Sequence, residues 1–145
     1  MSGRKSRWLV AACAVWMQAA CVVAPASWSK AELRAAARDG DTEAQYVLGL
    51  RCEQGTDGES ADAVEAARWY TAAATSGHAA AQNNLGLQFY RGVGVKQSVE
   101  VARHWFERSA AQGCSHGATN LGVLFLLGHG VVRDVPRARE LLVPA

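Results

Sequence analysis

The sequence predicts an all-α fold, a solenoid built from stacked pairs of antiparallel helices. Three observations lead to this prediction. The chain aligns with itself at a shift of about 36 residues, a period typical of helical solenoids. Glycine recurs where each expected helix ends, and Asp or Ser recurs where the second helix of each pair begins. Half of the residues are hydrophobic, so a packed helical core can form without a metal ion or disulfide bonds.

The repeat is clearest in the first helix of each unit, which carries the motif Ala-x-x-x-Leu-Gly or a close variant. This motif aligns residues 44–49 with 81–86 and 117–122. In the same register Trp69-Tyr70 aligns with Trp105-Phe106. We therefore expect about two and a half to three repeats, at residues 41–77, 78–113 and 114–145, preceded by a capping helix within residues 27–40.

The helix ends follow from capping chemistry. A side-chain oxygen of Asp or Ser accepts a hydrogen bond from a free backbone N–H of the first turn, and a glycine in the left-handed conformation closes the last turn. Asp62, Ser98 and Asp134 are the expected N-caps, and Asp62 with Glu65 suggests a capping box. Expected helices cover residues 30–39, 42–54, 62–76, 79–91, 98–112 and 115–127. A truncated last helix follows Asp134, because Pro144 ends it.

Small residues indicate how the two helices of a unit pack. Gly49, Gly86 and Gly122 lack a side chain, so the second helix can approach closely there. Ala66, Ala102, Trp69 and Trp105 are the residues expected to face them. Cys52 occupies a core position of its helix and Cys114 a turn between units. We therefore expect no bridge between them, with Cys52 acting as a small hydrophobic residue and Cys114 as a free thiol.

The loop Gly92-Val93-Gly94-Val95, with the Leu-Gly motif before it and Ala102-x-x-Trp105-Phe106 after it, resembles the Sel1-like repeat of the tetratricopeptide-repeat-like superfamily. The resemblance covers residues 31–142, although the first loop is one residue longer and lacks the Val. It implies a right-handed superhelix and a role as an adaptor or scaffold without a common catalytic residue. Some secreted relatives carry paired cysteines and are associated with penicillin binding, but this sequence has Ala or Thr where those pairs would lie.

Residues 1–26 have the pattern of a secretion signal: a basic start, an apolar run, and Ala24-Pro25-Ala26 as a cleavage motif. We therefore expect an exported protein, either periplasmic or secreted. Two alternatives stay open for this segment. Residues 8–24 could anchor the chain in a membrane, or Cys21 could carry a lipid. A membrane contact is expected only in these two cases.

Charge and motifs argue against several functions. Three of the basic residues lie in the leading segment, so the rest of the chain is slightly acidic, and no basic stripe for nucleic acid is present. Ser115 stands in a Gly-x-Ser-x-Gly motif, but a helix rather than a strand is expected before it. Ser27 and Lys30 match Ser-x-x-Lys without the partner motifs of that site.

His78, Cys114 and His116 lie in corresponding turns, without the further ligands that a metal site needs. We expect no catalytic residue, metal site or cofactor.

The expected function is binding of a peptide or protein partner on the concave face, which the first helices line. Apolar character there grows toward the C-terminus, where self-association is a further expectation because the last helix is short. The expected binding residues are Tyr46, Leu50, Gln54, Asn83, Leu87, Tyr90, Arg91, Thr119, Val123, Leu126 and Leu127. The alternatives are a penicillin-associated, hydrolase-like cell-wall protein and a degenerate fragment of a longer array.

Overall fold

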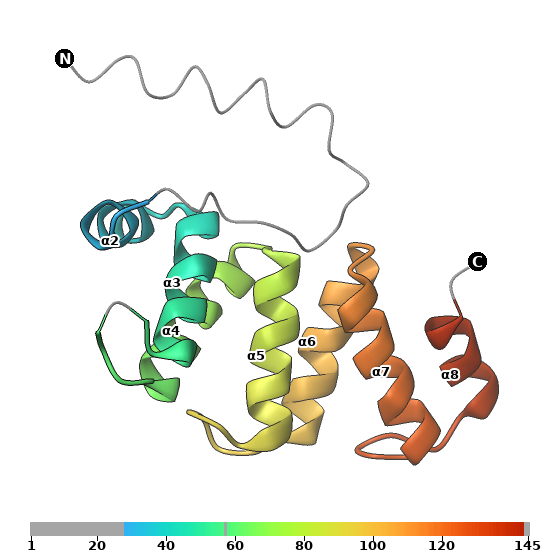
Figure 1. The fold of residues 1–145 in the computed structure, drawn as a ribbon. Helices are drawn as coiled ribbons and strands as arrows, with labels where there is room; N and C mark the ends of the chain where they lie inside the picture. The colour runs from blue at the N-terminus through green and yellow to red at the C-terminus, as the bar shows by residue number, and fades with distance from the viewer. Residues whose placement is uncertain (1–27, 57, 144–145) are drawn as a thin grey trace.

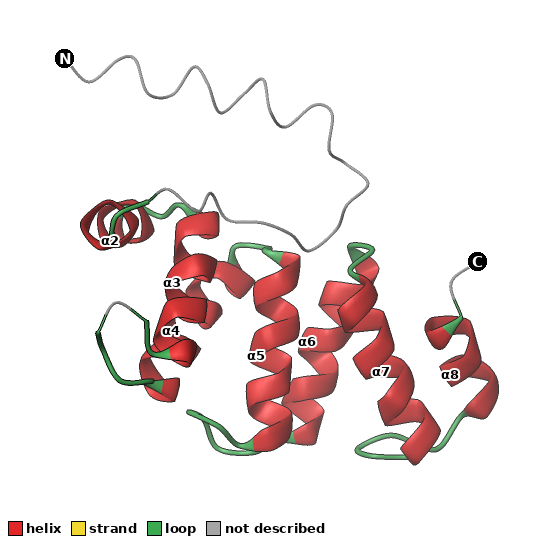
Figure 2. Ribbon diagram, viewed as in Figure 1, coloured by secondary structure: helices red, strands yellow, loops and turns green. Residues whose placement is uncertain are grey.

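The computed structural model describes residues 28–56 and 58–143, which form seven helices and no strand (Figures 1 and 2). The helices are α2 (Lys30–Arg38), α3 (Thr42–Gln54), α4 (Ala63–Thr75), α5 (Ala79–Arg91), α6 (Val99–Ala111), α7 (Ser115–Leu127) and α8 (Val135–Leu142). These bounds agree with the expected helices to within about two residues. The predicted secretion signal, with its membrane-anchor and lipid alternatives, lies outside the described residues.

The second helix of each unit begins as expected. Asp62 Oδ1 accepts hydrogen bonds from the backbone N–H groups of Val64 and Glu65, at 3.0 and 2.9 Å. Ser98 and Asp134 cap α6 and α8 in the same way. The capping box predicted at Asp62 is only half formed, because the Asp62 N–H donates to the backbone oxygen of Cys52 at 2.8 Å instead of to Glu65.

That backbone hydrogen bond recurs in every unit. The N–H of Ser98 donates to the oxygen of Phe89, and the N–H of Asp134 to the oxygen of Phe125, both at 2.9 Å. The loop between the two helices of a unit is therefore closed by the same bond three times. A complete capping box occurs instead at Ser29 and Glu32, where α2 begins.

The second helices approach the glycines of the first helices closely, as predicted, and Ala102 lies against Gly86 as expected. The aromatic rings that meet the glycines are not the expected ones. A Cβ at Gly49 would lie 2.6 Å from the ring of Tyr70, and one at Gly86 would lie 2.6 Å from the ring of Phe106. Trp69 and Trp105 were expected there, and that prediction is wrong. The helices are rotated so that Tyr70 and Phe106, 0% and 1% exposed, point at the glycines.

The two tryptophans contact the preceding part of the stack instead. Trp69 packs against the cluster that α2 and α3 form around Leu33 and Leu48. Trp105 packs against the cluster that α4 and α5 form around Tyr70 and Leu85. Each tryptophan therefore joins its helix to an earlier unit, and the core continues along the solenoid.

The arrangement of the helices defines an inner layer. Neighbouring helices contact each other along the chain, and α5 also contacts α7, whereas α4 and α6 share no comparable contact. The first helices α5 and α7 therefore lie closer together than the second helices α4 and α6. Together with α3, the first helix of the first unit, they are called the inner layer below. This layer is the one on which a binding face was expected.

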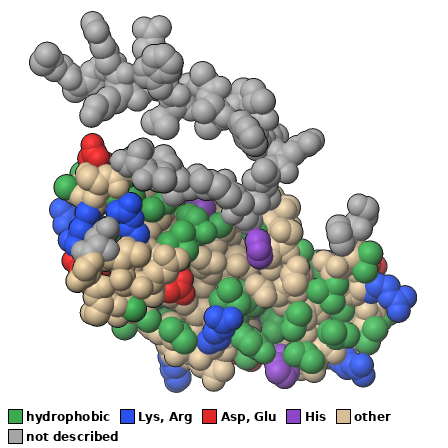
Figure 3. Space-filling model, in the orientation of Figure 1, with side chains coloured by type: hydrophobic (Ala, Val, Ile, Leu, Met, Phe, Trp, Pro, Cys, Tyr) green, Lys and Arg blue, Asp and Glu red, His purple; other side chains and the backbone are tan. Residues whose placement is uncertain are grey.

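The C-terminal end of the solenoid exposes apolar side chains. The last helix α8 has 8 residues, whereas α3 to α7 have 13 each. Leu126 and Leu127 at the end of α7 are 39% and 53% exposed, and Val132 is 88% exposed. Figure 3 shows hydrophobic side chains over this α7–α8 end of the molecule. The short helix thus leaves part of the last unit uncovered.

The cysteines differ in part from the expectation. Cys52 is a free thiol that packs beside the first core clusters, and its burial raises its pKa. Cys114 is fully buried and is not a free thiol, so the prediction of a free thiol there is wrong. Cys52 is free, so no bridge joins Cys52 to Cys114.

Among the described helices, none combines the length and the apolar character required to cross a lipid bilayer.

Substitution of Gly86 by alanine tests the close contact between α5 and α6. Alanine favours a helix by about 1 kcal/mol over glycine, so helix propensity alone predicts a more stable protein. The Cβ would lie 2.6 Å from the Phe106 ring, and such overpacking costs about 1–3 kcal/mol. We expect Gly86→Ala to lower the free energy of unfolding measured with urea. Adding Phe106→Leu should recover part of the loss, and a net rise for Gly86→Ala alone would contradict the contact.

Candidate binding site

The predicted partner-binding residues all lie on α3, α5 and α7, but at different depths. Those with exposed side chains are Gln54, Arg91, Thr119, Leu126 and Leu127. Those that are partly buried are Tyr46, Leu50, Leu87, Tyr90 and Val123, while Asn83 is buried. Leu87, Tyr90 and Arg91 come together at two adjoining pockets, whereas the other residues line neither pocket.

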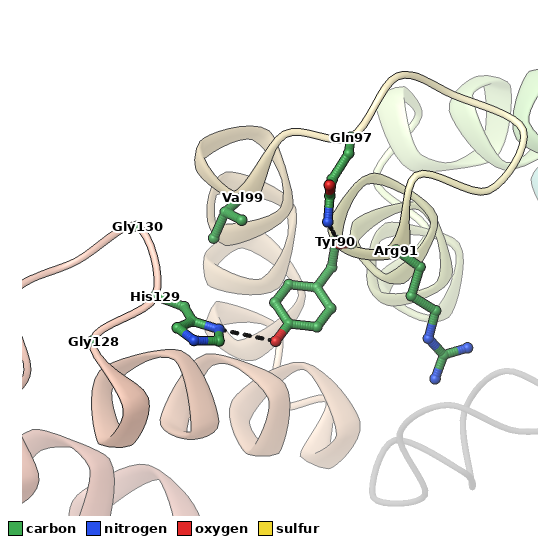
Figure 4. A pocket seen from close by; sticks show the side chains of 7 residues that line it. All are labelled: Tyr90, Arg91, Gln97, Val99, Gly128, His129 and Gly130. Atoms are coloured by element: carbon green, nitrogen blue, oxygen red, sulfur yellow. Dashed lines mark hydrogen bonds between the residues drawn. The ribbon is translucent and has the colours of Figure 1, made fainter.

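The larger pocket is open and has a volume of about 620 Å³. Its walls come from the end of α5, the start of α6 and the loop after α7; the lining residues are Tyr90, Arg91, Gln97, Val99, Gly128, His129 and Gly130 (Figure 4). A hydrogen bond of 3.1 Å joins the Tyr90 hydroxyl to His129 Nδ1. Gln97 Nε2 donates to the backbone oxygen of Tyr90 at 2.8 Å. The first bond holds the loop of the third unit against the end of α5, and the second fixes the loop that follows α5 within its own unit.

The smaller pocket has a volume of about 230 Å³ and lies between α3 and α5. Its lining residues are Glu53, Asn84, Leu87, Gln88, Arg91 and Val93. Arg91 lines both pockets, and Figure 4 shows its side chain extending away from Tyr90 and His129. The two pockets therefore form one band along the ends of the inner helices, with Arg91 at their junction.

Gln88 is the unusual group of the smaller pocket. Its side chain is 2% exposed, and neither Nε2 nor Oε1 has a hydrogen-bond partner among the described residues. An unsatisfied buried polar group costs stability. The equivalent residue of the third unit is Leu124, which is 1% exposed in the core. A polar residue at a position that is apolar in the next unit is a sequence signal that could have identified Gln88.

Glu53 is the acidic group of the smaller pocket, and it is engaged. Its Oε2 accepts a hydrogen bond of 2.7 Å from the Tyr70 hydroxyl. Burial, followed by the bond to Glu53, raises the pKa of Tyr70. Tyr70 therefore stays protonated and donates to Glu53, which fixes one wall of the pocket to the core of the first unit.

Two of the predicted residues have structural contacts. The ring of Tyr46 stacks on His78, with centroids 4.6 Å apart, and burial raises the pKa of Tyr46. The Asn83 side chain accepts from Asn120 Nδ2 at 2.8 Å, which ties α5 to α7. Both residues thus connect neighbouring helices.

The residues considered for chemistry have ordinary places in the fold. His78 caps α5: its Nδ1 accepts from the Ala81 N–H at 3.2 Å, so its Nε2–H donates to Glu43 at 2.8 Å. Ser115 is the exposed first residue of α7 and follows a helix and a turn, not a strand. Lys30 begins α2 and pairs with Glu59. Over residues 28–56 and 58–143, no group of three His, Cys, Asp or Glu side chains is placed to hold a metal ion.

Comparison with known proteins gives a consistent result. The sequence pattern of the Sel1 repeat matches residues 42–78, 79–114 and 115–145. A Sel1 repeat protein from Oxalobacter formigenes is 31% identical with a TM-score of 0.77, and the match covers 85% of this chain and 94% of that one. No curated protein matches the sequence at a significant level.

A second solved structure is c5321, a protective antigen present in uropathogenic Escherichia coli strains that displays an SLR fold. It is 40% identical with a TM-score of 0.74. That match covers 77% of this chain but only 24% of c5321, so this chain spans about a quarter of that relative.

Replacement of Gln88 by leucine tests whether its carboxamide is unsatisfied. Leucine occupies the equivalent place in the third unit, and removal of an unpaired buried amide is worth about 1–3 kcal/mol. We expect Gln88→Leu to raise the free energy of unfolding in urea. Gln82→Leu is the matched control, because Gln82 is equally buried but bonds Ala74 and Gln112, so its loss should destabilise. Destabilisation by both substitutions would show that Gln88 is satisfied.

Proposed function

Because the chain belongs to the Sel1 repeat family, whose members are typically non-catalytic protein-interaction scaffolds, we propose that it is an exported adaptor. It binds a peptide or protein partner through the inner face of α3, α5 and α7. The observation that carries this proposal is the pair of adjoining pockets on that face, which meet at Arg91.

The side chains of the band suit protein recognition. Tyr and Arg contribute most to binding energy at protein interfaces, and Tyr90 and Arg91 lie side by side at the end of α5. Leu87 and Val93 add apolar surface to the smaller pocket. The hydrogen bonds to Gln97 and His129 hold Tyr90 in place before binding, which lowers the entropy cost of association.

Export is supported by the leading sequence alone. The basic start, the apolar run and the small residues at 24–26 fit a cleaved secretion signal. A periplasmic or secreted location follows from that pattern, with the anchored and lipidated forms as the other fates of the same segment.

Self-association through the C-terminal face is the second part of the proposal. The terminal repeat of an array usually carries a polar capping face. Here Leu126, Leu127, Val132 and Val135 are exposed around the short α8. A second copy that packs on these residues would cover them, as a further helix pair would in a longer array.

Paired substitution on the inner face tests partner binding. We expect Tyr90→Ala/Arg91→Ala to reduce, by about tenfold or more, the recovery of specific partners. Recovery is measured by mass spectrometry after affinity purification of the tagged full chain from the envelope fraction of the producing cell. His104→Ala/Arg108→Ala is the control, because both residues are exposed on α6, outside the inner layer. Equal recovery with both double variants, at unchanged helicity, would refute the inner-face assignment.

Charge substitution at the C-terminal face tests self-association. We expect the wild-type chain to form dimers in light scattering at micromolar concentration, and Leu126→Glu/Leu127→Glu to yield monomers. Val64→Glu is the control, since Val64 is 52% exposed at the start of α4. A wild-type chain that remains a monodisperse monomer would contradict this part of the proposal.

A further inference from the structure

The smaller pocket contains an unused hydrogen-bonding group. Gln88 lines it and is 2% exposed, with donor and acceptor both unpartnered among the described residues. A carboxamide presents one N–H side and one C=O side in a plane, which is complementary to a peptide bond. Asn84 also lines the pocket, but its carboxamide is already engaged, because its Oδ1 accepts from Asn83 Nδ2 at 3.3 Å. A main-chain amide at the floor of the pocket would satisfy Gln88 once its carboxamide turns outward.

The charges at the pocket favour one kind of peptide. Arg91 is exposed, and no acidic side chain of the described residues pairs with it. Glu53, the acidic residue of the lining, accepts from Tyr70 and keeps its negative charge, so a ligand carboxylate is favoured only on the side of Arg91 that faces away from Glu53. The adjoining larger pocket has no acidic residue in its lining. A guanidinium binds carboxylates through paired, charge-assisted hydrogen bonds.

We propose that the smaller pocket is a subsite for an extended peptide segment that bears a carboxylate side chain. Gln88 binds the main-chain amide, and Arg91 binds the carboxylate on the side of the larger pocket, away from Glu53. Leu87 and Val93 contact the apolar part of the segment. This inference rests on the proposed peptide-binding function and names the chemistry of its ligand.

The position is specific to the middle unit. The residue equivalent to Gln88 in the first unit is Arg51, whose Nη2 donates to the backbone oxygen of Trp28 at 3.0 Å. In the third unit it is the buried Leu124. The residues equivalent to Arg91 are Gln54 and Leu127. The first unit thus has the guanidinium and the carboxamide exchanged, with Gln54 exposed instead of buried, and the third unit has two leucines. We therefore expect one such subsite among these units.

The test uses three blocked heptapeptides, acetyl-Ser-Ala-Ser-X-Ser-Ala-Ser-amide, with X as Asp, Asn or Lys. Each is titrated into the full chain, and binding is followed by NMR through the side-chain amide signals of Gln88 and Asn84. We expect the Asp peptide to bind about tenfold more tightly than the Asn peptide, because a charge-assisted bond replaces a neutral one. The Lys peptide should bind least.

Substitutions assign the two parts of the subsite. Arg91→Gln should bring the affinities of the Asp and Asn peptides to within about twofold of each other, and Arg91→Glu should favour the Lys peptide. Gln88→Leu should weaken all three peptides by about tenfold. Arg108→Gln, on α6, is the matched control and should change nothing. The folding of each variant is checked by its helicity and its midpoint in urea.

Several results would overturn the subsite. They are the absence of binding by all three peptides at millimolar concentration, an Asp preference that survives Arg91→Gln, and affinities unchanged by Gln88→Leu. The purification experiment separates this inference from the broader function. Partner capture that depends on Tyr90 and Arg91, without acid preference, would leave the adaptor function standing and refute the subsite. Acid-selective peptide binding without any partner recovered in the purification would support the subsite and refute the adaptor function.

Discussion

The close contact between a glycine of each first helix and a side chain of each second helix sets the geometry of the solenoid. The rings of Tyr70 and Phe106 and the side chain of Leu142 occupy the space that a Cβ would need at Gly49, Gly86 and Gly122. Each contact brings two helices close enough for the N-cap residue of the second to donate to the first. The loop ends are thereby fixed in the same way three times, and these loops form much of the wall of the larger pocket. The binding band thus depends on contacts buried behind it.

Much of the fold could be predicted because its determinants are local. Capping residues and terminal glycines specify helix ends through bonds that span only a few residues, so the expected and observed helices nearly coincide. The rotation of a helix about its axis is not local, and this is why Trp69 was placed where Tyr70 packs. The capping box at Asp62 failed for a related reason: its N–H reaches back to Cys52, ten residues away in the chain.

The candidate site could be predicted only in part. Periodicity placed Leu87, Tyr90 and Arg91 on the inner layer, because residues three and four apart share a helix face. Glu53 and His129 join them only through the stacking of separate units, and Gln97 through the loop that follows α5; a single helix pattern encodes neither. Gln88 could have been identified from the sequence, because the equivalent residue of the third unit is the apolar Leu124. Its meaning depends on the lack of a partner, and that lack is a property of the three-dimensional packing.

The buried carboxamide of Gln88 connects stability with function. The core position that holds Leu124 in the third unit holds the unsatisfied amide of Gln88 in the second. Proteins retain residues that lower stability in this way where function requires them. In a repeat array each unit contacts mainly its neighbours. The loss of stability caused by the unsatisfied Gln88 carboxamide is therefore confined to the middle unit, whose helices pack against a unit on each side. The position of Arg91 also differs between units: it holds Gln54 in the first unit, Arg91 in the second and Leu127 in the third. The inner face thus passes from a polar end through a charged subsite to an apolar end, so recognition of a ligand and contact with a second copy can occupy different units.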